Sequence, residues 1–482
     1  MAERRLVGID LGIASAHTVR VLDGEGNTVA KRRAWPTATS LAEVEAAALA
    51  DTPDGTRLEV VIEPTGPAWL PIAVYFTARG HTVHRVSSAK AADLRRFLSR
   101  HAKSNGIDAD TLARLPLVDP AGLRPLELPG PELAALDRRV RATDRLTRQA
   151  SKHKIRIKDL VRQLMPMTPL TGALGAADLA VLSRWADPNT LVRVSVKRLS
   201  GVIVKASNNH QGEARADEWL RAAHAAVELY GGHRAVAFEE LAAEVVSEIR
   251  LLRAVERELA AHVPPRERAY RYADPGELAR SLPGVAEVGG PALVACMGDP
   301  SRFRCAKQFR SFTGLAPRAS ETGDSDRKGQ PMSKAGSALL RTTLVRAADT
   351  ARHQDPQLAR LYWVQMTERG KDHLGALCVV AAHLAERAWA VMERGTPYVV
   401  CDVDGTPVTP AEAKAIIAQR WTVTAEVRQR RRARKAGKAP QKVLVGHPEP
   451  DARGVGKRGD LPRQAWSPPG DSPVKGLAAS AT

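Results

Sequence analysis

Cysteine is scarce in this chain of 482 residues, which contains only four. They are scattered among apolar neighbours, and none belongs to a Cys-x-x-Cys pair: Cys296, Cys305, Cys378 and Cys401. This spacing argues against a disulfide framework and against a zinc ribbon. We therefore expect the cysteines to be reduced core residues.

Long hydrophobic runs are also missing. The most apolar helical stretch, from Leu374 to Met392, is interrupted by His383, Glu386 and Arg387 and is too polar to span a bilayer. The first residues lead straight into a strand-like segment, without the apolar core of a signal peptide. These absences predict a cytoplasmic protein with no membrane as partner.

Acidic residues are in short supply relative to basic ones. The chain has 53 Asp and Glu against 72 Lys and Arg, which gives a formal net charge of +19. Such an excess predicts a polyanionic partner, and nucleic acid is the first candidate. We expect a nucleoid-associated protein, and the chain length predicts several domains rather than one.

Strand and helix patterns alternate at the start of the chain. Strands are predicted at residues 6–10, 17–22, 28–33, 59–63 and 82–86, and helices at residues 41–50 and 69–79. Three early strands followed by β-α-β units predict a mixed sheet with helices on its faces. We assign residues 1–130 to this α/β domain.

A basic helix is predicted next, over residues 131–165. Between Glu132 and Arg162 it has ten basic and four acidic residues. A solvated helix face is the ordinary explanation of such a run, but the excess of six charges favours contact with phosphates. The residues for which we expect nucleic-acid contact are Arg138, Arg139, Arg145 and Lys152.

The rest of the chain is predicted to be mostly helical. Residues 166–230 form an insertion of unknown role, and residues 231–277 form a helical or coiled-coil linker whose heptads are interrupted by Glu248. This linker is compatible with an intramolecular hairpin or with an intermolecular coiled coil. Residues 278–400 are expected to form a small, mostly helical domain, and residues 401–482 a basic, largely disordered tail.

The small helical domain begins with a glycine-rich segment. From Leu282 to Ala292 its sequence, LPGVAEVGGPA, is similar to a helix-hairpin-helix turn, whose backbone amides can bind a DNA phosphate. A tight turn between two packed helices explains the same pattern. Both interpretations stay open at this point.

Acidic residues lie at the ends of apolar segments in the first domain. Asp10 ends the first strand in VGIDLG and Glu63 ends a later one in VVIEPTG, while Asp108 lies in KSNGIDAD, one helical turn after Asn105. Carboxylates gathered at strand ends suit Mg²⁺ (or Mn²⁺) held with positions open for phosphate. Sugar kinases and chaperone ATPases begin with a similar GIDLG strand, but the later nucleotide-binding loops of those proteins do not follow in a convincing context.

Further motifs in the second half accompany this acidic set. They are GDPSRF from Gly298, FRSFTGLAPR from Phe309, ETG from Glu321, MSKAG from Met332 and LR from Leu340. Together with Asp10, Glu63 and residues 103–108, they resemble the DEDD transposases of the IS110 (IS116/IS902-like) insertion-sequence family. The resemblance covers residues 5–165 and 278–398.

The resemblance implies both a fold and an activity. The fold is a ribonuclease-H-like N-terminal domain similar to the resolvase RuvC, followed by a helical linker and a C-terminal transposase domain. The activity is RNA-guided recombination, in which the two domains form a composite site across a homo-oligomer (dimer or tetramer) and a noncoding guide RNA pairs with donor and target DNA. Carried over to this chain, Asp10, Glu63 and Asp108 are the metal ligands of the catalytic site.

Two positions depart from the family pattern. Asn105 stands where the third acid is typical, and it offers only a neutral carbonyl oxygen. Thr322 stands where a serine precedes glycine, and its hydroxyl can act as the nucleophile once activated. Ser325 is the alternative nucleophile. Asp110 is a poorer substitute for Asn105, because it points in another direction on the helix.

Basic residues flank the loop that carries the nucleophile. We expect them to contact phosphates beside the attacked bond, where fixed positive charge stabilises the transition state, although solubility is the plainer explanation. They are Arg318, Arg327, Lys328 and Lys334.

The sequence leaves two functions open. The ordered acidic and hydroxyl motifs favour an active DNA transposase or recombinase that depends on a divalent metal. The departures at Asn105 and Thr322 raise the alternative of a transposase-derived protein that binds nucleic acid without cleaving it.

Overall fold

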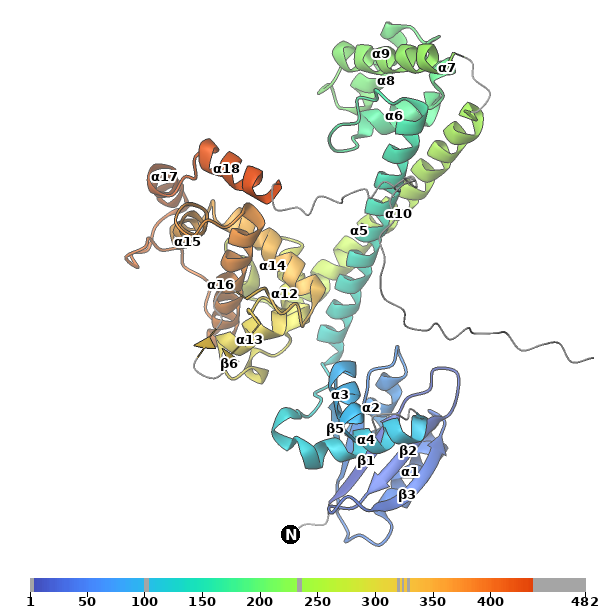
Figure 1. Ribbon diagram of the computed structural model, residues 1–482, viewed down its shortest axis with the longest axis vertical. Coiled ribbons are helices and arrows are strands. Elements are labelled where there is room, and N and C mark those ends of the chain that lie inside the picture. The colour runs from blue at the N-terminus through green and yellow to red at the C-terminus, as the bar shows by residue number, and fades with distance from the viewer. Residues whose placement is uncertain are drawn as a thin grey trace, which may run out of the picture.

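The computed structural model describes residues 4–98, 104–231, 236–318, 321–322, 325–326 and 330–436. Figure 1 shows a sheet domain at the bottom, a pair of long helices above it, a helical cap at the far end of this pair and a second helical domain beside its lower part. The chain enters the cap through one long helix and leaves it through the other.

The sheet domain has five strands in the order β3-β2-β1-β4-β5. Their bounds are β1 Arg5–Asp10, β2 His17–Leu22, β3 Thr28–Ala34, β4 Leu58–Ile62 and β5 Thr82–Arg85. The pairs β3-β2 and β2-β1 are antiparallel, whereas β1-β4 and β4-β5 are parallel. This is the mixed sheet that the three early strands and the later β-α-β units predict.

Helices cover both faces of the sheet because the central strands are apolar on both sides. They are α1 Ala38–Leu49, α2 Trp69–Ala78, α3 Ser88–Leu98 and α4 Asn105–Val118. On one face, α1 and α2 share a core with alternate strand residues such as Val7 and Ile9. On the other face, α3 and α4 pack on Val61 and its neighbours. The fold is therefore mixed α/β here.

Gly8 allows α4 to lie directly on β1. A Cβ atom at this position would stand 2.0 Å from the carbonyl oxygen of Ala109 and 2.4 Å from the amide nitrogen of Ala113. No side chain fits in that space, since both neighbours are backbone atoms. The close approach places the first turn of α4 beside the end of β1.

The two long helices form an antiparallel hairpin within the chain (Figure 1). Helix α5 runs over Pro131–Leu164 and α10 over Phe238–Ala273, so each is about 50 Å long. Glu248, which interrupts the heptads, accepts a hydrogen bond from His153 across the hairpin at 2.6 Å. Of the two arrangements left open by the sequence, the described chain forms the intramolecular one.

The cap at the tip of the hairpin consists of residues between the two long helices. Its helices are α6 Ala176–Trp185, α7 Pro188–Leu191, α8 Val196–Ala206 and α9 Glu213–Tyr230. They share one hydrophobic core with the upper parts of α5 and α10, and the fully buried Trp219 is its largest side chain.

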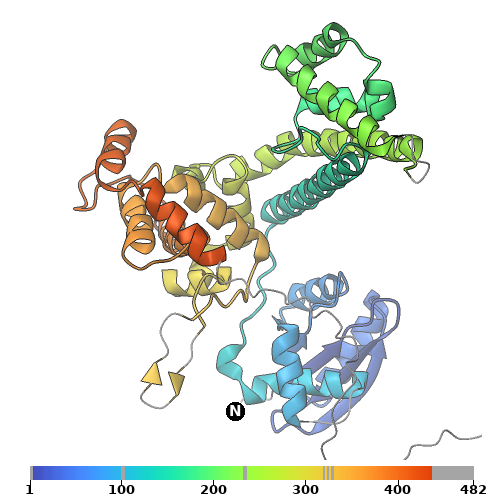
Figure 2. The same ribbon diagram turned by 45° about the horizontal axis from the view of Figure 1, so that its top comes forward.

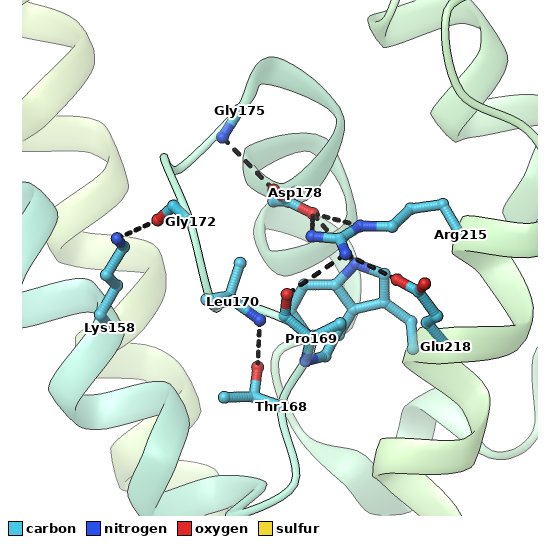
Figure 3. A network of polar contacts seen from close by, with 10 residues as sticks. Lys158, Thr168, Pro169, Leu170, Gly172, Gly175, Asp178, Arg215 and Glu218 are labelled. Atoms are coloured by element: carbon cyan, nitrogen blue, oxygen red, sulfur yellow. Dashed lines mark hydrogen bonds and ion pairs between the residues drawn. The ribbon is translucent and has the colours of Figure 1, made fainter. Parts of the chain in front are cut away.

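A buried carboxylate joins the cap helices α6 and α9 (Figure 3). Asp178 accepts hydrogen bonds from Nη2 of Arg215 at 2.8 Å and from Nε1 of Trp219 at 3.2 Å. Arg215 also pairs with Glu218, which is 44% exposed whereas the Asp178 side chain is 4% exposed. The ion pair with Asp178 is thus the one that is shielded from water.

The second helical domain follows the hairpin. Its helices are α11 Leu278–Ser281, α12 Gly289–Met297, α13 Ala306–Thr313, α14 Ala338–Ala351, α15 Pro356–Thr367 and α16 His373–Arg394. Two short strands, β6 Glu321–Thr322 and β7 Ser325–Asp326, form a small hairpin in it. Leu136 of α5 and Tyr270 of α10 belong to the same core, so the base of the long hairpin is built into this domain.

Helix α16 is long and apolar enough by length and composition to cross a membrane, but half of its apolar window is buried within the protein. It packs against α13, α14 and α15 as the central helix of the domain. Its polar residues have partners there, since Glu386 pairs with Arg310 at 2.7 Å and Arg387 with Asp355 at 3.2 Å. These contacts account for the interruptions in its apolar sequence.

The glycine-rich segment is a tight turn between packed helices. Gly284 has a φ of +73°, and a Cβ atom there would stand 2.1 Å from the carbonyl oxygen of Ala347 in α14. Its amide donates to the side chain of Gln354 at 2.7 Å. That amide is therefore used for a hydrogen bond within the domain and is not available to a phosphate.

Two sequence-based expectations differ from the structure. The tail expected to be disordered from residue 401 instead contains α17 Pro410–Arg420 and α18 Ala425–Ala436; residues 437–482 lie outside the described part. Thr409 and Glu412 cap α17 reciprocally, and Val423 is buried in the domain core, which gives these helices local and tertiary support. Cys305 is exposed at the start of α13 and is not a core residue.

Replacement of Asp178 by alanine is expected to lower the free energy of unfolding by about 2–4 kcal/mol, because it leaves the buried indole donor of Trp219 without its acceptor and removes the shielded partner of the partly buried Arg215. The matched variant Glu218→Ala removes the exposed partner of the same arginine and is expected to cost about 1 kcal/mol or less. Urea unfolding followed by circular dichroism measures both. Equal losses in the two variants would contradict this assignment.

Candidate metal site and nucleic-acid surfaces

The first two predicted acids lie side by side at one edge of the sheet. Asp10 is the last residue of β1, and Glu63 directly follows β4. The strands are parallel neighbours in which Ile9 pairs with Ile62, so the next residue of each strand occupies the same level. Strand spacing of about 4.8 Å then brings the two carboxylates to one place.

The start of α4 supplies the other two predicted residues. Ser104 caps the helix by accepting a hydrogen bond from the Ile107 amide at 3.3 Å, and Asn105 and Asp108 follow in the first turn. A cavity of about 420 Å³ is lined by Asp10, Glu63, Asn105 and Asp108 together. The structure therefore brings all four members of the predicted acidic set to one cavity.

Arg95 of α3 also lines this cavity. Its Nη1 atom donates to Oδ1 of Asp108 at 3.0 Å, and both side chains are only about a quarter exposed. No motif in the sequence marks this residue. The signal was the basic pair at residues 95–96, just before the acidic segment, but charge alone did not show that one of the two faces the carboxylates.

His17 supports the wall of the cavity from behind. Its Nδ1 atom accepts a hydrogen bond from the amide of Gly12, a lining residue, at 3.1 Å. Burial lowers the pKa of His17, so the neutral ring that this hydrogen bond requires is favoured.

The donor set of the cavity fits a hard divalent cation. Three carboxylates and one amide oxygen are the ligand types that Mg²⁺ and Mn²⁺ prefer. Among the described residues, however, no three His, Cys, Asp or Glu side chains already surround one point, and Asp108 is paired with Arg95. The residues fit the ion chemically, and Arg95 engages one oxygen of the Asp108 carboxylate.

Asp110 is placed differently from the four residues above. Its carboxylate pairs with Nε of Arg114 at 2.7 Å within α4, and it does not belong to the cavity lining. The position two residues after Asp108 points elsewhere, as helical geometry requires.

The two candidate nucleophiles belong to the two paired strands of the small hairpin. Thr322 in β6 and Ser325 in β7 are partners in the antiparallel register. Figure 2 shows these strands standing away from the helices of their domain and apart from the sheet, and in Figure 1 they are again apart from the sheet. Backbone pairing alone therefore does not choose between the two hydroxyls.

The basic residues predicted near the hairpin divide into two groups. Arg318 and Lys334 are exposed on either side of it, and the backbone of each is tied by a hydrogen bond, to Pro331 and Gly314 respectively. Arg327 and Lys328 lie outside the described residues.

The basic helix α5 has a free basic face. Acidic residues of α10 neutralise part of its charge, as in the pairs Lys154–Glu256 and Arg156–Glu244. Among the described residues, those expected to contact nucleic acid are exposed and form no ion pair: Arg138, Arg139, Arg145 and Lys152.

Models of known protein families match two separate parts of the chain. A transposase family model of the IS110 DEDD type matches residues 7–166, and the model described as transposase IS116/IS110/IS902 family matches residues 276–363. The first range contains the sheet domain and α5, and the second contains most of the second helical domain. The cap lies between the two matches.

Individual relatives support the same assignment. The insertion element IS110 protein of Streptomyces coelicolor is 24% identical over 81% of this chain and 95% of its own length. A probable family 20 transposase of Pseudomonas aeruginosa is 31% identical over 33% of this chain and 46% of its own length. A pilin gene-inverting protein of Moraxella bovis is 26% identical over 25% of this chain and 38% of its own length, so the match spans less than half of these last two relatives. The chain carries the DEDD domain and the C-terminal transposase domain of the IS110/IS116/IS902 family.

Proposed function

We propose that this protein is a transposase that cuts and rejoins DNA at a divalent metal site formed by its sheet domain. The observation that carries the proposal is the convergence of Asp10, Glu63, Asn105 and Asp108 on one cavity in a domain of the DEDD type. Two carboxylates come from neighbouring strands, and two side chains come from α4, which packs closely on β1 because Gly8 has no side chain.

Mg²⁺ or Mn²⁺ bound in this cavity supplies Lewis-acid activation of a DNA phosphate. Asp10, Glu63 and Asp108 would hold the ion with their carboxylates, and Asn105 would add one carbonyl oxygen. Arg95 releases Asp108 for this purpose and remains at the rim as a cation for phosphate oxygens.

The second domain supplies the nucleophile in this proposal, with Thr322 preferred over Ser325. The hydroxyl oxygen forms a bond to phosphorus, and the bond from phosphorus to the neighbouring nucleoside oxygen breaks. That oxygen leaves as a hydroxyl with the proton that the nucleophile loses. The small hairpin lies apart from the sheet domain, whose residues line the cavity, in both views of one chain. We therefore propose that the hairpin and the cavity meet between two copies in a dimer or tetramer.

Donor and target DNA are the substrates in this proposal, and a noncoding guide RNA is the partner that selects them. The free basic residues on α5 support contact with phosphates, which carry no sequence information. Selection by base pairing with an RNA is consistent with a protein surface of this kind. Arg318, Arg327, Lys328 and Lys334 are assigned to phosphates near the reacting bond.

A protein that binds nucleic acid without cleaving it is the second candidate. Two observations favour it: Asn105 brings no charge to the cavity, and Arg95 cancels the charge of Asp108. In this alternative, turnover appears only after Asn105→Asp and Thr322→Ser restore the family pattern.

The first test is recombination by the purified full-length protein with Mg²⁺, the RNA from its own element, and donor and target duplexes. Asp10→Ala is expected to lower the rate about a thousandfold or more, because several kcal/mol of charge stabilisation depend on the metal site. Asp110→Ala, which removes a carboxylate of α4 outside the cavity, is expected to keep the rate within about threefold of the parent. A fully active Asp10→Ala protein would refute the metal site, and an inactive parent would favour the second candidate.

Arg95→Gln is expected to raise the affinity for Mn²⁺ about fivefold, because Asp108 no longer has to give up an ion pair worth about 1 kcal/mol. Isothermal titration calorimetry without DNA measures this directly. Arg96→Gln is the matched control, since Arg96 pairs with Asp93 on the exposed side of α3. An unchanged or lower affinity in Arg95→Gln would show that the arginine does not compete with the ion.

The nucleophile is tested by trapping the covalent protein–DNA adduct with labelled DNA on a denaturing gel. Thr322→Ala is expected to abolish the adduct, because the attacking oxygen is lost, while Ser325→Ala is expected to retain it. The reverse pattern would move the role to Ser325. Thr322→Ser keeps a hydroxyl and should restore the adduct.

A further inference from the structure

A second cavity lies in the second helical domain, and most of its lining residues follow the segment 276–363 that the transposase model matches. It has a volume of about 310 Å³ and is formed where α18 covers the ends of α14, α15 and α16. Four of its nine lining residues are arginines and one is a carboxylate: Arg352, Arg428, Arg431, Arg432 and Asp372. An arginine-rich cavity of this kind is suited to an anionic ligand.

Helix α18 is held in place by contacts that leave part of its charge free. Trp421, just before it, packs edge-on against Trp363 of α15, and Val423 is buried. Arg431 donates to the carbonyl oxygens of Met366 and Thr367 at 2.9 and 3.1 Å, which ties the helix to the end of α15. This side chain is a structural anchor.

Arg428 and Arg432 are the free cations of the cavity. They lie one turn apart on the same face of α18 as the anchor, and both are exposed. Within the described part of the chain neither forms an ion pair, whereas Arg352 is paired with Asp349 at 2.9 Å. Residues four apart on a helix have Cβ atoms about 5–6 Å from each other, so these two unpaired guanidinium groups can reach neighbouring phosphates of one nucleic-acid strand.

The floor of the cavity is apolar and aromatic. Tyr362 is buried and its hydroxyl meets Nδ1 of His373 at 2.8 Å, while the His373 ring and Leu374 are about half exposed. Burial and the positive charges of Arg352 and Arg428 lower the pKa of His373, although Asp349 acts in the opposite direction. The lowered pKa favours the neutral form of the ring. A half-exposed leucine beside a neutral ring offers a surface for the face of a base.

We propose that this cavity binds an unpaired nucleotide segment, with Arg428 and Arg432 on consecutive phosphates and a base against Leu374 and His373. Its volume lies at the lower end of the range of about 300–1,000 Å³ for small-ligand pockets, so it admits one unpaired nucleotide but not a duplex. Two transposase-domain helices and the helices that follow them thus form a single-strand site separate from the metal cavity. The choice of a polynucleotide as ligand rests on the proposed function, whereas the cavity itself does not.

The test uses the full-length protein without divalent metal and short fluorescent oligonucleotides of mixed sequence: single-stranded RNA, single-stranded DNA and duplex DNA. Arg428→Gln combined with Arg432→Gln is expected to weaken single-strand binding about tenfold. The slope of log Kd against log salt concentration should fall by about 1.4, because each phosphate contact on a single strand contributes about 0.7. Loss with RNA, with DNA or with both supports the site, and loss with only one of them identifies the source of the strand.

The matched control combines Lys414→Gln with Arg430→Gln, which removes the same charge from exposed positions of α17 and α18 outside the cavity. It is expected to leave the slope unchanged. Equal effects of the two double variants, no effect of either, or an equal loss with duplex DNA would overturn the proposal. The binding readout needs neither metal nor turnover. Failure of the recombination assay would therefore count against the proposed function alone, and failure of the binding assay would count against the single-strand site alone.

Discussion

The backbone contact between β1 and α4 is the constraint on which the candidate metal site depends. Gly8 lets the carbonyl of Ala109 and the amide of Ala113 occupy the space of a side chain. Without this contact, Asn105 and Asp108 would not reach the strand ends that carry Asp10 and Glu63. A residue with no side chain thus allows two candidate ligands of α4 to lie beside the two candidate ligands at the strand ends.

The long hairpin joins two separate hydrophobic cores. Its tip is packed into the cap and its base into the second helical domain. Helix α5 follows the sheet domain along the chain, after residues 119–130, so the hairpin also connects the sheet domain to these two cores. Exposed basic residues of the same helix, such as Arg138 and Arg145, lie between these parts.

Charge pairing distinguishes structural from available cations in this strongly basic chain. Arg215, Arg387 and Arg431 are occupied by a carboxylate or by carbonyl groups within the fold. Arg145, Arg428 and Arg432 have no such partner among the described residues. Arg95 belongs to both classes, since the carboxylate that it pairs with lines the proposed metal site.

Periodicity and residue type were sufficient to predict the mixed sheet, the acids at its strand ends and the basic helix, because each is encoded in a short segment. The sequence could not predict that Arg95 pairs with Asp108, that Glu248 meets His153, or that residues 410–436 fold onto the second domain. Those outcomes depend on contacts between segments far apart in the chain. The composition of residues 401–482 predicts their positive charge. Only the tertiary packing of Val423 and Trp421 decides which arginines of α18 remain without an ion pair.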